Sequence, residues 1–320
     1  MKYNTRSFLG LAVLAGVSLV TPAFAGVNIG YVDVGNINNA ADTTGYGAVA
    51  YNYKIARNET TISQYSEFLN AAAKSDPYAL YSTNMASNTP TAGITRSGSS
   101  GNYSYAAVAG SENKPITFVS WFDAARFCNW MHNGQGAGSA EDGAYTLNGA
   151  MSGIYTKNAN ATVWIPSEDE WYKAAYYDAT KGGYWLYPTQ SDTMTTNDIG
   201  VAGAANYYDA NGFATYVDGT SWGITDVGAY GENSKSAYGT NDQAGNIYEW
   251  NDAVVGSSRG VRGGNWNHSA SAVASSGRGL TNPSTEYPYY NGFRVASVPE
   301  PSAMVLTMLA GGVLVTRRKR

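Results

Sequence analysis

Helical periodicity is confined to three short stretches of this chain, and it fades from about residue 200 of 320. The first stretch, Ser63–Ala73, places Tyr65, Phe68, Leu69 and Ala72 on one face. Elsewhere turn-forming residues interrupt the apolar ones, and 37 residues are glycine. Such a pattern excludes long helices and coiled coils. We therefore expect an α+β domain with few short helices and much irregular chain.

Capping-box patterns mark the starts of the other two helices. Ser120 and Asp123 open one, and Ser167 and Glu170 open the other. In each pair, the two side chains satisfy backbone N–H groups that the first turn of a helix leaves free. Short apolar runs typical of strands occur at 163–165, 254–255 and 293–295.

The middle of the chain is acidic. The two ends hold six of the 20 basic residues and one of the 24 acidic ones, which leaves 14 bases against 23 acids, a net charge of −9. A nucleic-acid binder needs a basic stripe that displaces counterions, so we expect no nucleic-acid partner.

The single cysteine, Cys128, excludes an internal disulfide. Because it shares a helix face with Trp121, we interpret it as a small buried hydrophobe.

Residues 1–25 have the organisation of a secretory signal peptide. Lys2 and Arg6 precede an apolar run, Phe8–Val20, and an Ala-Phe-Ala cleavage site ends at Ala25. The alternative is a membrane anchor, but the run is short for a span of the bilayer. We therefore expect export across the inner membrane and cleavage after Ala25.

Residues 299–320 contain a Pro-Glu-Pro sequence, an apolar run at 303–315 and a basic cluster at 317–320. In this order they resemble the PEP-CTERM sorting signal of Gram-negative bacteria. The resemblance implies that an exosortase recognises and removes the tail after transient membrane anchoring. The protein would then be on the cell surface, in the extracellular matrix or secreted. The alternative is an ordinary tail anchor, with the basic cluster left in the cytoplasm.

Six motifs occur in order along the middle of the chain. They are Glu59–Thr61, Pro115–Ala125, Ile165–Trp171, Asp242–Trp250, Arg262–Trp266 and Asn291–Arg294. Together they resemble the formylglycine-generating enzyme family, also called sulfatase-modifying factors. The resemblance indicates one domain over residues 26–298, with its core at about 51–294. It also implies an irregular variant of the C-type lectin fold, with low regular secondary structure.

Active members of that family oxidise a sulfatase cysteine to formylglycine with molecular oxygen, and two cysteines after the Arg-Gly-Gly motif hold copper(I). Thiolates suit copper(I) because both are soft. In this chain the two corresponding positions fall on His268 and Val273. Since valine cannot ligate a metal, we expect no copper site and no catalytic residues of the family's kind. The only other histidine, His132, follows a distant helix, so His268 is interpreted as a loop or core residue.

The resemblance implies structural calcium instead, held by hard oxygen ligands. One site would consist of Asp242, Gly245, Ile247 and Glu249, and a less secure second site of Asn206, Tyr207, Asp218 and Thr220. The alternative is that Asp242 and Glu249 are solvated or paired with arginine. We also expect Glu59, Arg262 and Arg294 to be structural, because buried charges need partners.

Two functions remain open at this stage. The first is a non-catalytic, calcium-supported scaffold whose loops bind polysaccharide, peptide or matrix. Its aromatic contacts would come from the tryptophans and from Tyr207, Tyr208, Tyr287, Tyr289 and Tyr290, although packing in the core or in loops is the alternative for most of these residues. The second is an oxidoreductase of the same family that uses a different metal or cofactor. The missing cysteine pair favours the first.

Overall fold

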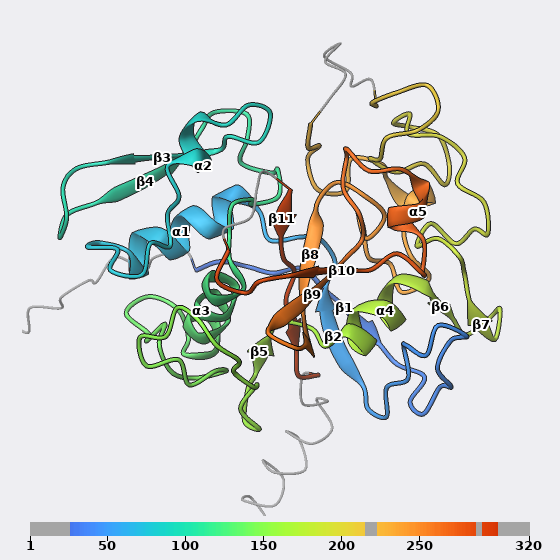
Figure 1. Ribbon diagram of the computed structural model, residues 1–320, viewed down its shortest axis with the longest axis horizontal. Coiled ribbons are helices and arrows are strands. Elements are labelled where there is room, and N and C mark those ends of the chain that lie inside the picture. The colour runs from blue at the N-terminus through green and yellow to red at the C-terminus, as the bar shows by residue number, and fades with distance from the viewer. Residues whose placement is uncertain (1–25, 215–222, 286–289, 300–320) are drawn as a thin grey trace, which may run out of the picture.

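The computed structural model describes residues 26–214, 223–285 and 290–299 (Figure 1). Two sheets of four strands organise this part of the chain. The first sheet has the order β1-β2-β12-β5, with bounds Tyr31–Val34, Tyr53–Ala56, Ala296–Ser297 and Val163–Trp164. The second has the order β10-β9-β8-β11, with bounds Gly279–Thr281, Ser258–Arg262, Tyr248–Val255 and Asn291–Gly292.

The predicted ends of the chain, the signal peptide at 1–25 and most of the sorting signal at 299–320, lie outside the described residues. The same holds for four residues named above as candidates, Asp218, Thr220, Tyr287 and Tyr289. No helix within the described ranges is long and apolar enough to cross a membrane.

The three predicted helices are present and are the longest that the structure describes. α1 spans Ile62–Ala72, one residue earlier at each end than expected. α3 spans Trp121–His132, and α4 spans Glu168–Tyr176. Each begins with a complete capping box, in which the N-cap hydroxyl accepts from a backbone N–H and the N3 side chain accepts in return. The box of α1, formed by Thr61 and Gln64, is an addition to the two that the sequence predicted.

The remaining elements are short. Two small helices, α2 and α5, span Asn84–Ser87 and Ala270–Val273, and a 3₁₀ turn spans Glu232–Ser234. Two hairpins are formed by β3 with β4 and β6 with β7, with bounds Ile94–Ser97, Ser104–Ala107, Tyr177–Asp178 and Gly183–Tyr184. The expectation of few short helices and much irregular chain is confirmed.

Of the predicted strand runs, two are confirmed. Residues 163–164 form β5, and 254–255 end β8. Residues 293–295 lie between β11 and β12 and belong to neither, so a strand there is wrong. This segment crosses from one sheet to the other, because β11 pairs with β8 whereas β12 pairs with β2 and β5.

Aromatic side chains fill the space between α1 and α3. The Phe127 ring lies 5.5 Å from Phe68 and 5.3 Å from Phe293, both in edge contacts. Such pairs contribute about 0.5–1.5 kcal/mol beyond the area that they bury. Cys128 is fully buried beside them, and burial raises the pKa of its thiol well above the usual value. Its expected role as a buried hydrophobe is confirmed.

Candidate functional site

The loop after β9 and the short helix α5 that follows it carry the two positions that correspond to the family's cysteine pair, His268 in the loop and Val273 at the end of α5. Gly264 lies in this loop with a φ of +69°, and a Cβ there would approach the Val273 side chain to 2.6 Å. Glycine is therefore needed for the backbone conformation and for the close approach of the loop to α5. Val273 itself is fully buried and packs with Ala205, Tyr207 and Ala244.

His268 lies at the other end of this loop, among aromatic rings. Its Nδ1 is 2.8 Å from the Asn265 Oδ1, and its ring lies 5.3 Å from Tyr248 and 6.0 Å from Tyr290. Burial lowers the pKa of His268, which favours the neutral imidazole. Since Val273 offers only hydrocarbon and His268 already engages Asn265, these residues do not fit a copper(I) pair.

Aromatic side chains continue from His268 to the surface. Tyr208 and Phe213 have ring centroids 4.9 Å apart and are 44% and 37% exposed, and Phe213 lies 5.5 Å from Trp266. The Tyr208 N–H donates to the His268 carbonyl at 3.0 Å, which holds the two loops together. We name the aromatic surface as Tyr208, Phe213, Tyr248, His268 and Tyr290, whereas Trp266 is 4% exposed and belongs to the core behind Phe213.

The tyrosines expected to contact a ligand differ in their exposure. Tyr208 is exposed and Tyr290 is half-buried. Tyr207 is 4% exposed and packs in the core, so its assignment to a binding face is wrong. Phe213 and Tyr248 were not singled out from the sequence. The available signal for Phe213 was an aromatic residue beside an Asn-Gly turn.

A buried ion pair occupies Glu249, one of the residues proposed for calcium. Both of its oxygens accept from the Arg294 guanidinium, at 2.6 and 2.7 Å, and Trp171 Nε1 donates to one of them at 2.8 Å. Neither side chain of the pair is exposed. The alternative named for Glu249, pairing with arginine, is the arrangement that the structure describes, and it leaves the carboxylate poorly suited to a metal.

Asp242 and Glu59 make a different environment beside that pair. Asp242 accepts from the Gly228 N–H at 2.6 Å, and burial raises its pKa to about 6. Glu59 accepts from Asn246 through Oε2, whereas Oε1 is buried without a hydrogen-bond partner among the described residues. Burial and the nearby Asp242 charge raise the pKa of Glu59 well above normal. An orphaned carboxylate oxygen next to a second carboxylate fits a cation, so Asp242 fits calcium better than Glu249 does.

The other residues proposed for calcium lie close to this cluster. Gly245 forms a bridge with Asn206 and approaches it so closely that a Cβ would lie 2.0 Å from the Asn206 carbonyl oxygen. That carbonyl accepts from the Asn246 N–H at 2.8 Å. The Tyr207 carbonyl accepts from Asn197 at 2.9 Å. The structure thus brings the described members of the two predicted sets side by side, but the carbonyl oxygens of Asn206 and Tyr207 already have hydrogen-bond partners.

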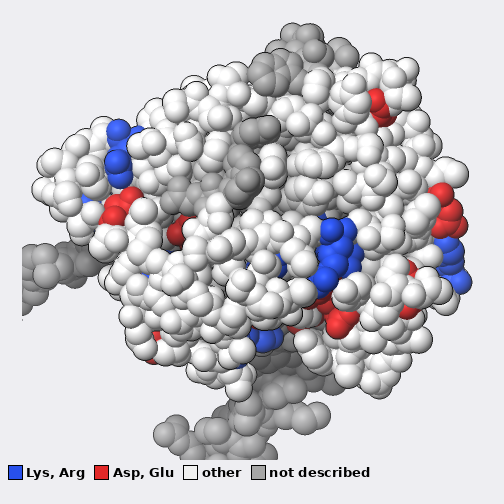
Figure 2. All heavy atoms as spheres, viewed as in Figure 1, with Lys and Arg blue, Asp and Glu red and all other residues white. Residues whose placement is uncertain are grey.

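Two expected structural arginines have acidic partners. Arg262 binds Glu168 at 2.7 Å, and Arg294 binds Glu249. Arg278 shares Glu168, also at 2.7 Å. Arg278 reaches the surface, whereas Glu168 is buried beneath it. Figure 2 shows few charged groups on the face that it draws. Among the described residues, no group of three or more His, Cys, Asp or Glu side chains is placed to hold a metal.

Comparison with known proteins decides the family. The sulfatase-modifying factor enzyme 1-like domain matches residues 22–298. The chain belongs to this family. No curated protein matches it significantly.

Solved structures support the fold of this sulfatase-modifying factor enzyme 1-like chain. It is similar to variable protein 1 of Treponema denticola, with 18% identity, a TM-score of 0.51 and coverage of 87% of this chain and 100% of that one. It is also similar to CarF, with 19% identity, a TM-score of 0.53 and coverage of 85% and 99%. At these identities the likeness shows the fold alone. The predicted irregular α+β fold of the sulfatase-modifying factor type is confirmed.

Proposed function

We propose that this protein is an exported, non-catalytic member of its family that binds an extracellular macromolecule through the aromatic surface. The observation that carries the proposal is Val273. At the position of the second cysteine, this chain has a hydrocarbon side chain buried in a core cluster. A thiolate pair cannot form, and the neighbouring His268 belongs to a partly exposed aromatic cluster instead.

Tyrosine and phenylalanine suit such binding because they bury a large area at low cost in side-chain entropy. Tyr208 and Phe213 lie in edge contact, and the hydrogen bond from Tyr208 to the loop of His268 supports them. A preformed aromatic surface loses little freedom on binding. Polysaccharide, peptide and matrix components are the ligand classes that we propose.

Calcium is proposed as a structural support at Asp242, with Glu59 as a neighbouring ligand in place of Glu249. A divalent cation would neutralise two buried carboxylates, on which the negative Glu249 acts as well as the positive Arg294 that is paired with it. Export, processing by an exosortase and a final place at the cell surface or in the matrix rest on the sequences of the two ends.

The experiment is a metal and oxygen test on the purified protein. Copper(I), iron(II) and calcium are offered separately, and oxygen consumption is measured with a cysteine-containing sulfatase peptide. We expect no oxygen consumption above that of the same metal and peptide without the protein. Stoichiometric copper or iron that is lost in His268→Ala, together with oxygen uptake, would refute the proposal and favour the alternative oxidoreductase.

The binding half of the proposal is tested on glycan and peptide arrays. Tyr208→Ala and Phe213→Ala should weaken any ligand found, whereas Met151→Ala should not. Met151 is a suitable control because its exposed fraction, 47%, is similar to the 44% of Tyr208, and it is not one of the residues of the aromatic surface. A ligand whose binding is unaffected by both aromatic substitutions would refute this assignment of the binding face.

A further inference from the structure

A polar cavity of about 590 Å³ lies at the C-terminal end of α3. Its wall combines the last residue of that helix and the C-cap with residues from the loops 142–146 and 158–160. The volume lies within the range of roughly 300–1,000 Å³ of small-molecule sites, but the lining is almost entirely polar rather than apolar. Such a lining selects a ligand that is itself rich in hydroxyl or amide groups.

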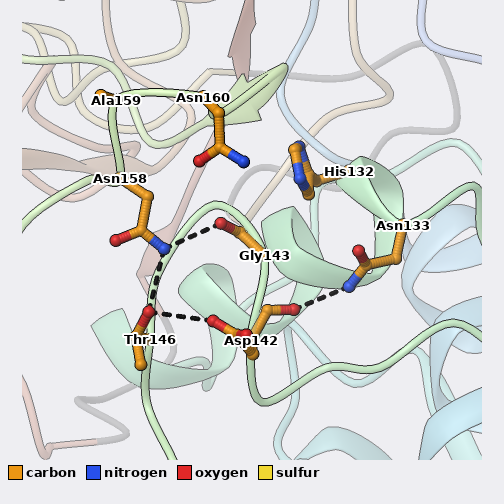
Figure 3. Close-up of a pocket in the computed structure, with 8 residues that line it drawn as sticks. All are labelled: His132, Asn133, Asp142, Gly143, Thr146, Asn158, Ala159 and Asn160. Carbon is orange, nitrogen blue, oxygen red and sulfur yellow. Dashed lines mark hydrogen bonds between the residues drawn. The ribbon is translucent and has the colours of Figure 1, made fainter.

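Hydrogen bonds hold the wall in place before any ligand binds. Asn158 Nδ2 donates to the Gly143 carbonyl at 2.9 Å and to Thr146 Oγ1 at 3.0 Å. Thr146 in turn donates to Asp142 at 2.9 Å, and Asn133 donates to the Asp142 carbonyl at 2.7 Å (Figure 3). Because these groups are already oriented, little side-chain freedom is lost on binding.

Several groups in the wall keep hydrogen-bonding capacity. The Asn158 bonds use its amide nitrogen, which leaves its oxygen as an acceptor. Thr146 bonds only one of the two Asp142 carboxylate oxygens. Within the described ranges, the Asn160 amide has no hydrogen-bond partner, and Figure 3 shows it across the opening from Asp142 and beside His132. The wall therefore offers both acceptors and donors.

His132 supplies a further donor in a defined tautomer. Its Nδ1 accepts from the Thr162 backbone N–H at 3.1 Å and lies 2.8 Å from the Thr162 hydroxyl, which can donate to it as well. A backbone N–H can only donate, so Nδ1 is unprotonated and the Nε2 of the neutral ring carries the hydrogen. The Nε2–H is the group that remains available on the ring.

The charge of the cavity narrows the ligand class. Asp142 contributes one carboxylate, none of the lining residues is Lys or Arg, and the carbonyl end of α3 adds partial negative charge. Anionic ligands such as phosphates and uronic acids are disfavoured. A lone divalent cation is also disfavoured. The cavity is large, calcium usually binds more than one carboxylate, and the His132 Nε2–H would repel a cation in the cavity.

We propose that this cavity binds a neutral saccharide unit, with Asp142, Asn158 and Asn160 bonding to its hydroxyl groups and His132 donating from Nε2. The Asp142 carboxylate presents acceptors, and the asparagine amides present an acceptor and donors, so together they match neighbouring hydroxyls that both donate and accept. The cavity lies by α3, on a different part of the fold from α5 and the loop of His268 (Figure 1). The proposal therefore does not depend on the aromatic surface or on the absence of oxidase activity.

The test is saturation-transfer NMR and titration calorimetry on the full-length protein. The probes are methyl glycosides of glucose, galactose and mannose, N-acetylglucosamine, and glucuronate as the anionic comparison. We expect at least one neutral sugar to bind, and glucuronate to bind more weakly than glucoside. Asn160→Ala should lower the affinity for that sugar about threefold to tenfold, which is the effect of losing one hydrogen bond.

Asn160 is the sharpest position for this test because its amide supports no other described residue, so its loss should leave folding intact. Asn102→Ala is the matched control, since Asn102 is an exposed asparagine in the turn between β3 and β4. Tyr208→Ala should leave sugar binding unchanged, which separates this proposal from the proposed function. The inference is overturned if no neutral sugar binds, if glucuronate binds as well as glucoside, or if Asn160→Ala binds like the wild type.

Discussion

Replacing Glu249 with glutamine removes one charge from the most deeply buried ion pair described in this protein. Arg294 donates two hydrogen bonds to Glu249, two to the carbonyls of Ala56 and Arg57, both at 3.0 Å, and one to the carbonyl of Asn241 at 2.8 Å. The guanidinium thus joins β2, the turn before β8 and β8 itself. Glutamine keeps the shape of the side chain but leaves Arg294 without its counter-charge.

Breaking a fully buried pair by removing one partner costs about 3–5 kcal/mol, because the remaining charge stays buried and uncompensated. Both side chains here are 0% exposed, so the full penalty applies. We expect the lower half of that range, because the Asp242 and Glu59 carboxylates also act on Arg294. For a domain of this size, such a loss lowers the melting temperature by roughly 10 °C.

The assay is thermal and urea unfolding followed by circular dichroism, once with excess EDTA and once with calcium. If the ion pair is structural, Glu249→Gln should lower the free energy of unfolding by the same amount in both conditions. If Glu249 is a calcium ligand, the free energy of unfolding should fall only when calcium is present. Glu232→Gln is the matched control, because Glu232 is an exposed partner of Lys235, and a surface pair of this kind contributes little. Its melting curve should match that of the wild type.

The reasoning fails if Glu249→Gln in EDTA unfolds within about 1 kcal/mol of the wild type, a difference that a buried pair cannot show. A double substitution gives a second check. Glu249→Gln combined with Arg294→Met should be less destabilising than the sum of the two single changes, because it removes the uncompensated charge.

Three further predictions concern calcium, the cysteine and the loop after β9. Burial raises the pKa of Asp242 to about 6, so the folded protein binds a proton that the unfolded chain has lost, and calcium-free stability should fall as the pH rises from about 4 to 7. Calcium should therefore raise the melting temperature more at about pH 7.5 than at pH 5, and Asp242→Asn should remove this effect. Cys128 should react with a thiol reagent only at the rate of unfolding, because it is buried and its pKa is raised, and a fast reaction in native buffer would contradict this. Gly264→Ala should cost about 1–3 kcal/mol in urea unfolding, because its φ is +69° and the new Cβ would meet Val273; an unchanged midpoint would contradict the close approach.

Local signals in the sequence were sufficient to predict the helices. The boxes at Ser120 and Ser167 depend on residues three positions apart, so the chemistry that starts each helix can be read directly from the sequence. The strand expected at 293–295 fails for the opposite reason. Phe293 and Val295 are apolar and buried, as in a strand. Their segment, however, passes from one sheet to the other and belongs to neither.

The site was harder to predict because its partners are distant in sequence. Glu249 and Arg294 are 45 positions apart, and only the pairing of β8 with β11 brings the two regions together. Tyr207 and Tyr208 are adjacent and chemically identical, yet one is buried and the other exposed. Irregular chain has no period of 2 or 3.6 residues from which the buried side chains can be predicted. The sequence could therefore indicate the loop that carries exposed aromatic residues, but not which of them are exposed.

The position of β12 in the first sheet determines when that sheet can fold. Residues 296–297 pair with β2 on one side and β5 on the other, so the last described strand fills the middle of the first sheet. Until that strand arrives, β2 and β5 each present an open edge. The first sheet cannot close until residues 296–297 are available to pair with both strands. A truncation that removes residues 296–297 should therefore leave β1 paired with β2 but β5 without a partner strand, and the open edge of β2 should pair with other chains.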